Sequence, residues 1–351
     1  MSDFRTVRGF EDVWRAPVRP RPFTPSTLRG TMTSSVGPDV RARLARVAGR
    51  APEVMVKVTG RTRDAIGLRA HLDYISRNGG LDLEDQDGAR LTGRPAVKEL
   101  ADDWIDAALS DRRRRATTPF SLSIMLSMPA GTNPIAVRDG ARAFAAEVFA
   151  GRHDYVFTLH TDTPRPHVHL SVCARAHGGE RLNPKKTDLD HWRQVFAQAL
   201  RDRGVEAEAT PRRARGVTRK AERAPLRRIR ERHEAGLGGP AQMRRSAYKD
   251  AAKAAFGGVD RPIWESRLVD RQAKVRGLYL AQAKVLALSS DPADRALGAK
   301  VTAFVQSMPQ PDTQRLALAR ELRAVKFGLQ RSPDENRRAD HLPRGPDRSR
   351  N

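Results

Sequence analysis

One stretch of the sequence, HTDTPRPHVHL from His160 to Leu170, limits how its part of the chain can fold. It joins two runs with the alternation typical of half-buried strands, YVFTLHTD and PHVHLSVCARA. The connection between them, Thr163–Pro166, is a short turn that contains proline. Strands this close in sequence can be neighbours in an antiparallel hairpin, whereas parallel strands need a long crossover. We therefore expect the two runs to pair.

Strand and helix patterns continue on both sides of this hairpin. EVMVKVTG, which begins at Glu53, and FSLSIMLSMPAG, which begins at Phe120, predict two more strands. The stretch DAIGLRAHLDYISRNGG predicts a helix that stops at Asn78-Gly79-Gly80, because such residues commonly end helices. Further helices are expected over AVKELADDWIDAAL, PIAVRDGARAFAAEVFAG and TDLDHWRQVFAQALRDRG, the last one capped by Thr187 or Asp188. The mixture predicts an α+β fold.

The texture of the sequence suggests four segments. Residues 1–50 are basic and rich in proline, which predicts a largely disordered segment with a short basic helix around Asp39–Val47. Residues 51–216 carry the strands and helices of a folded domain. Residues 217–330 are expected to be basic and mostly helical, and 331–351 to be a disordered tail. The GxxxxGK[ST] phosphate-binding pattern is absent from the sequence, so no nucleotide-driven motor is expected.

The charge of the chain indicates its partner. Lys and Arg number 65 against 41 Asp and Glu, a formal net charge of +24. Such an excess is typical of proteins that bind a polyanion, nucleic acid first and an anionic membrane surface second. No apolar run approaches the ~20 residues that span a bilayer, and the start of the sequence lacks the core of a signal peptide. With Cys173 as the lone cysteine, we expect a cytoplasmic, DNA- or RNA-binding protein that does not insert into membranes.

The histidines of the hairpin predict a metal site. Side chains alternate along a strand, so His167 and His169 point to one side while Val168 points to the other. Pairing of the two strands would bring His160 beside them. Three imidazoles leave coordination positions open, as in catalytic sites, and they suit Zn, Mn, Fe, Ni or Cu better than Ca. Asp162 could accept a hydrogen bond from a ring N–H.

A phosphodiester is the substrate that such a site in a very basic protein would act on. The nucleophile could be a metal-bound water, which gives hydrolysis, or a side chain, which gives a covalent intermediate. A histidine-rich surface loop is the non-catalytic alternative. Basic runs, among them the Arg-rich segment Arg212–Arg232, would neutralise phosphates without base specificity.

Four motifs resemble those of the conjugative relaxases, specifically the P-class mobilisation nucleases that include the T-DNA border endonucleases. HTDTPRPHVH has the form H-x-D-x-x-x-P-H-x-H of the family's metal-binding motif. LRAHLDYISRNGGLDLED resembles the first motif, in which Tyr74 takes the position of the tyrosine in Y-[IL]-S-R. LSIMLSMPAGTNP resembles the second, and RLNPKKTDLDHW resembles the start of the segment after the histidines. The likeness covers roughly Glu53 to Gly216 in the family's order.

This resemblance implies a histidine–hydrophobe–histidine (HUH) endonuclease fold, an antiparallel sheet flanked by helices. His160, His167 and His169 would bind a divalent ion, Mg²⁺ or Mn²⁺ in function, with other transition metals possible. Tyr74 would be the nucleophile, with Tyr155 as the fallback, and Asp162 would orient a histidine or help to accept the tyrosine proton. The basic residues expected to contact DNA are Arg77, Arg112, Arg113, Arg114, Arg115, Lys185, Lys186, Arg212, Arg213 and Arg215.

The implied activity is that of a DNA relaxase. Metal-dependent, site- and strand-specific nicking at an origin of transfer would pass through a 5′-phosphotyrosyl intermediate and start conjugative transfer or mobilisation. The implied partners are single-stranded and supercoiled DNA, accessory proteins of a relaxosome and the coupling protein of a type IV secretion system.

Other functions compete with this one. A rolling-circle replication initiator would share the ion site, but there the tyrosine usually follows the histidines, whereas Tyr74 precedes them here. A non-enzymatic DNA-binding accessory protein with a decayed site is suggested by Cys173, because the family often has Asn near this position. A structural zinc domain is the weakest alternative, since three histidines without a fourth ligand leave the site open.

Overall fold

The computed structural model describes residues 4, 6–14, 40–219, 224–239, 242–257 and 262–330. The expected disordered tail, 331–351, and most of the N-terminal segment lie outside the described residues. The described part of that segment holds a 3₁₀ helix, η1 (Phe10–Val13), and helix α1 (Val40–Ala48). Helix α1 coincides with the short basic helix expected around Asp39–Val47, so that prediction is confirmed.

The chain divides into two compact units. The first comprises residues 1–211 and 281–304, and the second comprises 212–280 and 305–351. The four segments expected from the sequence have other boundaries than these two units, and they remain predictions. The strands of the first unit are β1 (Met55–Thr62), β2 (Leu83–Asp85), β3 (Arg90–Leu91), β4 (Ser121–Ser127), β5 (Tyr155–His160) and β6 (His167–Cys173). Its longer helices are α2 (Ala65–Ile75), α3 (Gly93–Leu109), α4 (Pro134–Phe149) and α5 (Lys186–Arg201).

The six strands form one antiparallel sheet in the order β1-β4-β6-β5-β2-β3. Strands β5 and β6 pair as a hairpin, as the short turn between them predicted, with His160 opposite His167. Strand β6 lies between β4 and β5, at the centre of the sheet. The α+β class and the antiparallel sheet flanked by helices are confirmed.

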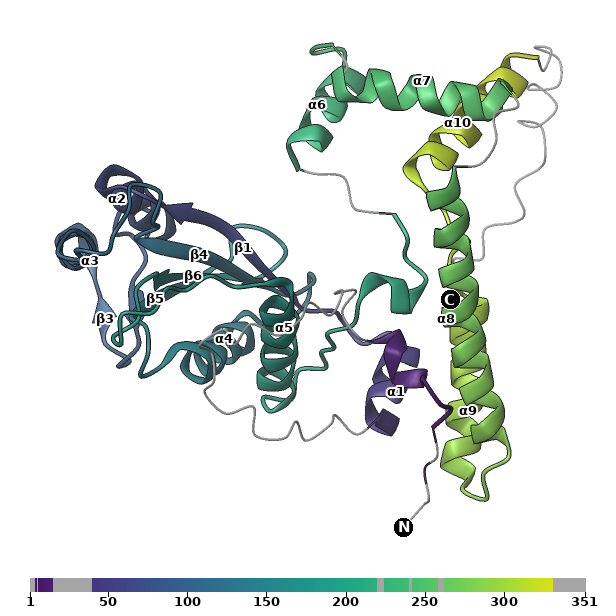
Figure 1. Cartoon of the computed structure of the whole chain (residues 1–351), viewed down its shortest axis with the longest axis horizontal. Coiled ribbons are helices and arrows are strands. Elements are labelled where there is room, and N and C mark those ends of the chain that lie inside the picture. Colours follow the sequence, from purple (N-terminus) through teal and green to yellow (C-terminus); the bar gives the residue numbers. More distant parts are fainter. Residues whose placement is uncertain are drawn as a thin grey trace, which may run out of the picture. The chain divides into compact units, whose positions relative to one another are not determined.

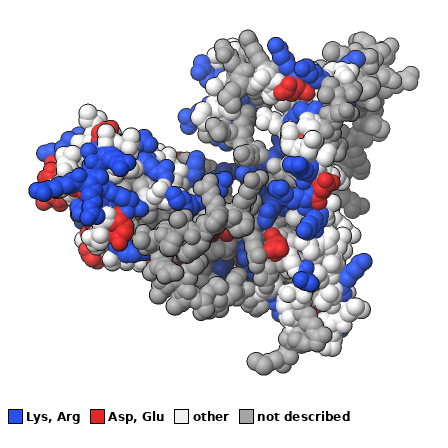
Figure 2. Space-filling model, viewed as in Figure 1, with Lys and Arg blue, Asp and Glu red and all other residues white. Residues whose placement is uncertain are grey.

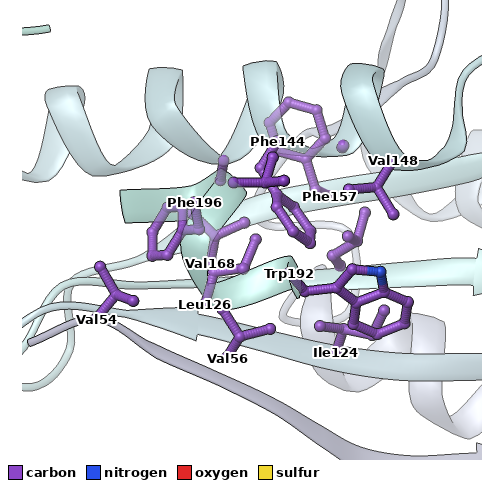
Figure 3. Close-up of a cluster of buried hydrophobic side chains, with 14 of the residues drawn as sticks. Val54, Val56, Ile124, Leu126, Phe144, Val148, Phe157, Val168, Trp192 and Phe196 are labelled. Atoms are coloured by element: carbon purple, nitrogen blue, oxygen red, sulfur yellow. The ribbon is translucent and has the colours of Figure 1, made fainter. Parts of the chain in front are cut away.

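Helices cover both faces of the sheet (Figure 1). Helices α4 and α5 cover one face, where Val168, Leu170 and Val172 of β6 join a large apolar core. Figure 3 shows part of this core, in which Phe144, Phe196 and Trp192 meet side chains of the strands. Helices α2 and α3 cover the opposite face with a second apolar cluster. Alternation along β6 therefore places its histidines on the α2–α3 side.

The small hairpin of β2 and β3 is a feature that the sequence pattern did not predict. Its strands are short and polar, so they carry no apolar alternation. The Asp85 carboxylate accepts hydrogen bonds from the backbone N–H groups of Asp87 and Ala89, and Gly88 takes a positive φ of 82°. Asp-Gly is a common hairpin turn. Strand β2 extends the sheet by pairing with β5.

The second unit is helical in its described part, as expected. Its elements are η2 (Arg212–Arg215), α6 (Ala224–Glu234), α7 (Gln242–Phe256), most of α8 (Ile263–Ala287) and α10 (Gln314–Gln330), while α9 (Pro292–Gln306) lies mainly in the first unit. Helices α7 and α10 pack through Ala251, Leu318 and Ala319. Among the described residues, none of the helices has the length and apolar character needed to cross a membrane.

Candidate active site

Three histidines meet at the turn end of the β5–β6 hairpin. His160 ends β5, His167 begins β6 directly opposite, and His169 follows two residues later on the same face. The ring centroids of His160 and His169 are 4.5 Å apart, and those of His167 and His169 are 5.1 Å apart. One nitrogen from each ring lies within 4.8 Å of the others. The hairpin thus gathers the three side chains as the strand alternation predicted.

Burial keeps two of these imidazoles neutral. His160 is 2% exposed and His169 is 7% exposed, while His167 is half-buried. Desolvation, with the neighbouring His160 and His167 as further causes, lowers the pKa of His169 to about 3. Desolvation also lowers the pKa of His160. Neutral imidazole is the form that offers a lone pair to a metal.

Backbone carbonyls fix which nitrogen is free on two of the rings. A carbonyl can only accept, so Nε2–H of His160 donates to Ile75 O at 2.7 Å and Nδ1–H of His167 donates to Arg165 O at 3.1 Å. The lone pairs are then on Nδ1 of His160 and Nε2 of His167. Carbonyl acceptors of this kind commonly orient ligating histidines. Three imidazoles suit a transition-metal ion and leave positions open for substrate.

Tyr74 lies beside this cluster. Its ring centroid is 5.7 Å from that of His169 and 6.4 Å from that of His160. The neighbouring Leu72 and Ile75 are buried against the sheet and anchor the last turn of α2, whereas Tyr74 is 55% exposed. Tyr155 is different: it is 2% exposed and belongs to the core under α4 and α5, on the other face of the sheet. The structure therefore brings Tyr74, and not the fallback Tyr155, to the histidines.

A left-handed turn follows Tyr74. Helix α2 ends at Ile75, and then Arg77, Asn78 and Gly79 all take positive φ values, 53°, 57° and 82°. The Ser76 hydroxyl accepts a hydrogen bond from the N–H of Gly79 at 3.1 Å and helps to hold the turn. Arginine in this conformation costs about 1 kcal/mol. The turn aims the Arg77 side chain back at the histidines instead of letting it continue along a helix.

Arg77 contacts three members of the site. Its Nη2 atom forms an ion pair with Asp162 and lies 3.2 Å from Nδ1 of His160. Its guanidinium carbon lies 5.3 Å from the centroid of the Tyr74 ring. Asp162 is thus held by Arg77. The sequence predicted that Asp162 accepts a hydrogen bond from a histidine ring, but the ring N–H groups of His160 and His167 donate to the carbonyls of Ile75 and Arg165 instead.

His71 is a neighbour of the site to which the sequence gave no role. It lies one turn before Tyr74 on α2, its Nε2 is 2.9 Å from the hydroxyl of Ser123, and burial lowers its pKa. Its charge is also among the causes that lower the pKa of His169. The i, i+3 spacing of His71 and Tyr74, which places both on one side of a helix, is the signal that could have identified it.

Cys173 lies away from the histidines. It shares their face of β6 but follows His169 by four residues, ~13 Å along a strand. It packs in the apolar cluster with Phe120 and Val156, and burial raises the pKa of its thiol. Cys173 is therefore too far from the histidines to contact them or an ion that they bind.

The other predicted DNA contacts are distributed over the chain. Arg112–Arg115 precede β4, whose first residue pairs with Cys173, so they lie at the opposite end of the sheet from the histidines. There Arg114 stacks over Phe120 and donates to the carbonyl of Arg63. Lys185 and Lys186 lie at the start of α5. Arg212, Arg213 and Arg215 lie in η2 of the second unit. Figure 2 shows Lys and Arg side chains over much of the visible surface.

Comparison with known families identifies the class of this domain. Residues 74–205 match the family model described as "Relaxase: MobA/VirD2-like, nuclease domain". The matched segment contains Tyr74 and all three histidines. The segment is therefore similar to relaxase nuclease domains, which confirms the resemblance inferred from the motifs.

Individual relatives are similar to this chain over about half of its length. The chain is 30% identical over 187 residues to the T-DNA border endonuclease VirD2 of Rhizobium radiobacter and 29% identical over 209 residues to that of Agrobacterium fabrum. These matches cover 47% and 51% of this chain, but only 43% and 46% of the two relatives. A solved MobM relaxase domain (MOBV; Mob_Pre) bound to a 26-nucleotide pMV158 oriT DNA aligns with 15% identity and a TM-score of 0.34, over 45% of this chain and 90% of that one. The chain thus spans less than half the length of the curated relatives it matches.

Proposed function

We propose that this protein nicks one strand of DNA at an origin of transfer, in a reaction that needs a divalent metal ion and joins Tyr74 to the DNA. The observation that carries the proposal is the exposed Tyr74 ring, 5.7 Å from His169 within a cluster of three histidines. A nucleophile beside a candidate ion site is the arrangement that covalent phosphoryl transfer requires.

The chemistry assigned to Tyr74 is a transesterification. The phenolic oxygen attacks phosphorus, the P–O3′ bond breaks, and the products are a 5′-phosphotyrosyl bond and a free 3′-hydroxyl. A tyrosine pKa near ~10 means that the phenol proton must pass to a base. We assign this role to Asp162, which Arg77 holds beside His160. Because the phosphotyrosyl ester keeps the energy of the broken bond, a 3′-hydroxyl can later reverse the reaction.

His160, His167 and His169 are the residues that would hold the ion. A bound divalent ion would polarise a non-bridging phosphate oxygen and stabilise the charge of the transition state. We propose Mn²⁺ or Mg²⁺, of which three imidazole donors favour Mn²⁺, because Mg²⁺ prefers oxygen ligands.

The substrate is proposed to be single-stranded or supercoiled DNA carrying an origin of transfer. The relatives named T-DNA border endonucleases support a DNA substrate, as does the net charge of +24. We assign phosphate contacts to Arg77, to Lys185 and Lys186, and to Arg212, Arg213 and Arg215, and contacts remote from the histidines to Arg112–Arg115. Accessory proteins of a relaxosome and the coupling protein of a type IV secretion system are proposed partners in the cytoplasm.

A plasmid assay tests this function. Supercoiled plasmid bearing an origin of transfer, taken from the genetic element that encodes the protein, is incubated with the full chain and either Mn²⁺ or a chelator. Open-circular plasmid should form only with the ion, and a matched plasmid without the origin should stay supercoiled. DNA binding without nicking in Mn²⁺ and in Mg²⁺ would instead support the non-enzymatic accessory role.

A further inference from the structure

One nitrogen of Arg77 bridges two members of the site. Its Nη2 atom lies 3.2 Å from Nδ1 of His160 and is also the atom that pairs with Asp162. We propose that Arg77 and the metal ion are alternative partners of His160, so that ion binding releases the Arg77 guanidinium toward a DNA phosphate. The proposal rests on the ion site of the proposed function and adds a role for Arg77 within it.

The competition follows from the lone pairs of one imidazole. Neutral histidine has one N–H group and one nitrogen lone pair. Nε2–H of His160 is committed to the Ile75 carbonyl at 2.7 Å, so the lone pair is on Nδ1. Arg77 can only donate, and its Nη2 is within reach of that lone pair. An ion ligated by Nδ1 needs the same electrons, so the two cations exclude each other.

Release from His160 also affects Asp162. The same Nη2 atom serves both residues, so its movement away from the histidine disturbs the ion pair with the carboxylate. A guanidinium keeps its positive charge at any working pH and is repelled by a divalent ion. Ion binding would thus separate the Arg77 guanidinium from both His160 and Asp162.

The released guanidinium would remain close to the nucleophile. Arg77 follows Tyr74 by three residues, and the left-handed turn that holds it is tied down through Ser76 and Gly79. Its guanidinium carbon is 5.3 Å from the centroid of the Tyr74 ring, and its side chain is 39% exposed, so it has room to move. A phosphate approached by Tyr74 would lie within its range, and the planar fork of arginine suits two phosphate oxygens.

Metal affinity tests the competition without using activity. Mn²⁺ binding to the full chain is measured by titration calorimetry for the wild type and for Arg77→Met, which keeps the hydrocarbon stem but has no charge and no donor. Loss of the competitor should tighten Mn²⁺ binding on the order of tenfold, the effect of one charge-assisted hydrogen bond. The matched control is Arg69→Met on the preceding helix α2, because Arg69 pairs with Asp102 instead. Its Mn²⁺ affinity should stay within twofold of the wild type.

A double-mutant cycle separates competition from a new carboxylate ligand. If Arg77→Met acted by freeing Asp162 to bind the ion, the gain would vanish in an Asp162→Asn background. The proposal predicts that Arg77→Met/Asp162→Asn still binds Mn²⁺ about tenfold more tightly than Asp162→Asn alone. Unchanged or weaker binding by Arg77→Met would overturn the competition while leaving the ion site intact. No Mn²⁺ binding by the folded wild type would overturn the ion site itself.

Binding of the released Arg77 guanidinium to a DNA phosphate can be measured separately. In a Tyr74→Phe background, which forms no covalent bond, Mn²⁺ should raise the affinity for a single-stranded origin oligonucleotide. Part of that gain should be lost, by a few-fold or more, when Arg77→Met is added, since the freed guanidinium contributes to it. An equal gain in both proteins would show that Arg77 does not move to the DNA.

Discussion

His160 and His167 occupy directly paired positions at the turn end of the β5–β6 hairpin, with ring centroids 5.4 Å apart. Strand pairing, rather than loop conformation, therefore sets the distance between two of the three candidate ligands. His169 joins them because side chains two residues apart share a face. The geometry is built into the centre of the sheet and should be present without DNA.

The first prediction concerns metal binding. Single substitutions of His160, His167 or His169 by Ala should each weaken Mn²⁺ binding by about 100-fold or more, because a three-ligand site loses a third of its donors. The measurement is titration calorimetry at pH 7.5. The control is His177→Ala, since His177 pairs with Asp154 outside the cluster. Retention of wild-type affinity by any two of the three variants would contradict the site.

The second prediction concerns the turn after Tyr74. A Cβ at Gly79 would lie 2.7 Å from the carbonyl carbon of Gly93 and closer still to the nitrogen of Arg94, at a φ of 82°. Gly79→Ala should lower the free energy of unfolding by about 3 kcal/mol, through strain and backbone overlap together. Gly88→Ala has the same φ with nothing within 4 Å and should cost only about 1 kcal/mol. Equal losses in urea unfolding would mean that the contact with α3 is not tight.

The third prediction is a pH dependence of stability. The pKa of His169 in the folded protein is about 3, against 6.5 for an ordinary histidine. Between these values the unfolded chain binds the extra proton and the folded chain does not. Stability should therefore fall as the pH drops from about 6.5 toward 3, with no contribution from His169 above 6.5. Melting temperatures in chelator should fall less steeply for His169→Gln than for the wild type, and parallel curves would refute this reading.

The fourth prediction concerns Cys173. An amide placed in its apolar cluster would be buried without an assigned partner, so Cys173→Asn should lower the free energy of unfolding by about 1–3 kcal/mol. Its Mn²⁺ affinity should equal that of the wild type, because the position lies ~13 Å along the strand from His169. Cys173→Ala is the control for loss of the thiol alone. A clear gain of Mn²⁺ affinity in the Asn variant would show that the position supports the ion site after all.

The sequence predicted those parts of the fold whose signal is local. Alternation and a short proline turn predict the β5–β6 hairpin and hence the histidine cluster, and Asn78-Gly79-Gly80 predicts the end of α2. The β2–β3 hairpin escaped prediction because its strands are too short and polar to alternate. The expected cap at Thr187 or Asp188 was two to three residues late: the helix begins at Lys186, and the Asp188 carboxylate accepts from the N–H of Lys185.

Relationships between distant residues could not be predicted from local pattern. The contact between Arg77 and His160 depends on a left-handed turn. This turn needs glycine at Gly79 because the backbone at the start of α3, which comes later in the sequence, approaches it closely. The position of Arg112–Arg115 at the far end of the sheet depends on the register of β4 with β6. Motif resemblance pointed to Tyr74 as the candidate nucleophile, whereas the sequence left open which face of β5 the fallback Tyr155 occupies.

The central claim is that Tyr74 forms the covalent bond to DNA. Full-length protein is incubated with Mn²⁺ and an end-labelled single-stranded oligonucleotide that carries the nick site, and the adducted peptide is mapped by mass spectrometry. The account predicts an adduct on Tyr74 that disappears in Tyr74→Phe and persists in Tyr155→Phe, whose site is buried on the other face of the sheet. An undiminished adduct in folded Tyr74→Phe, or an adduct mapped to another residue, would contradict it.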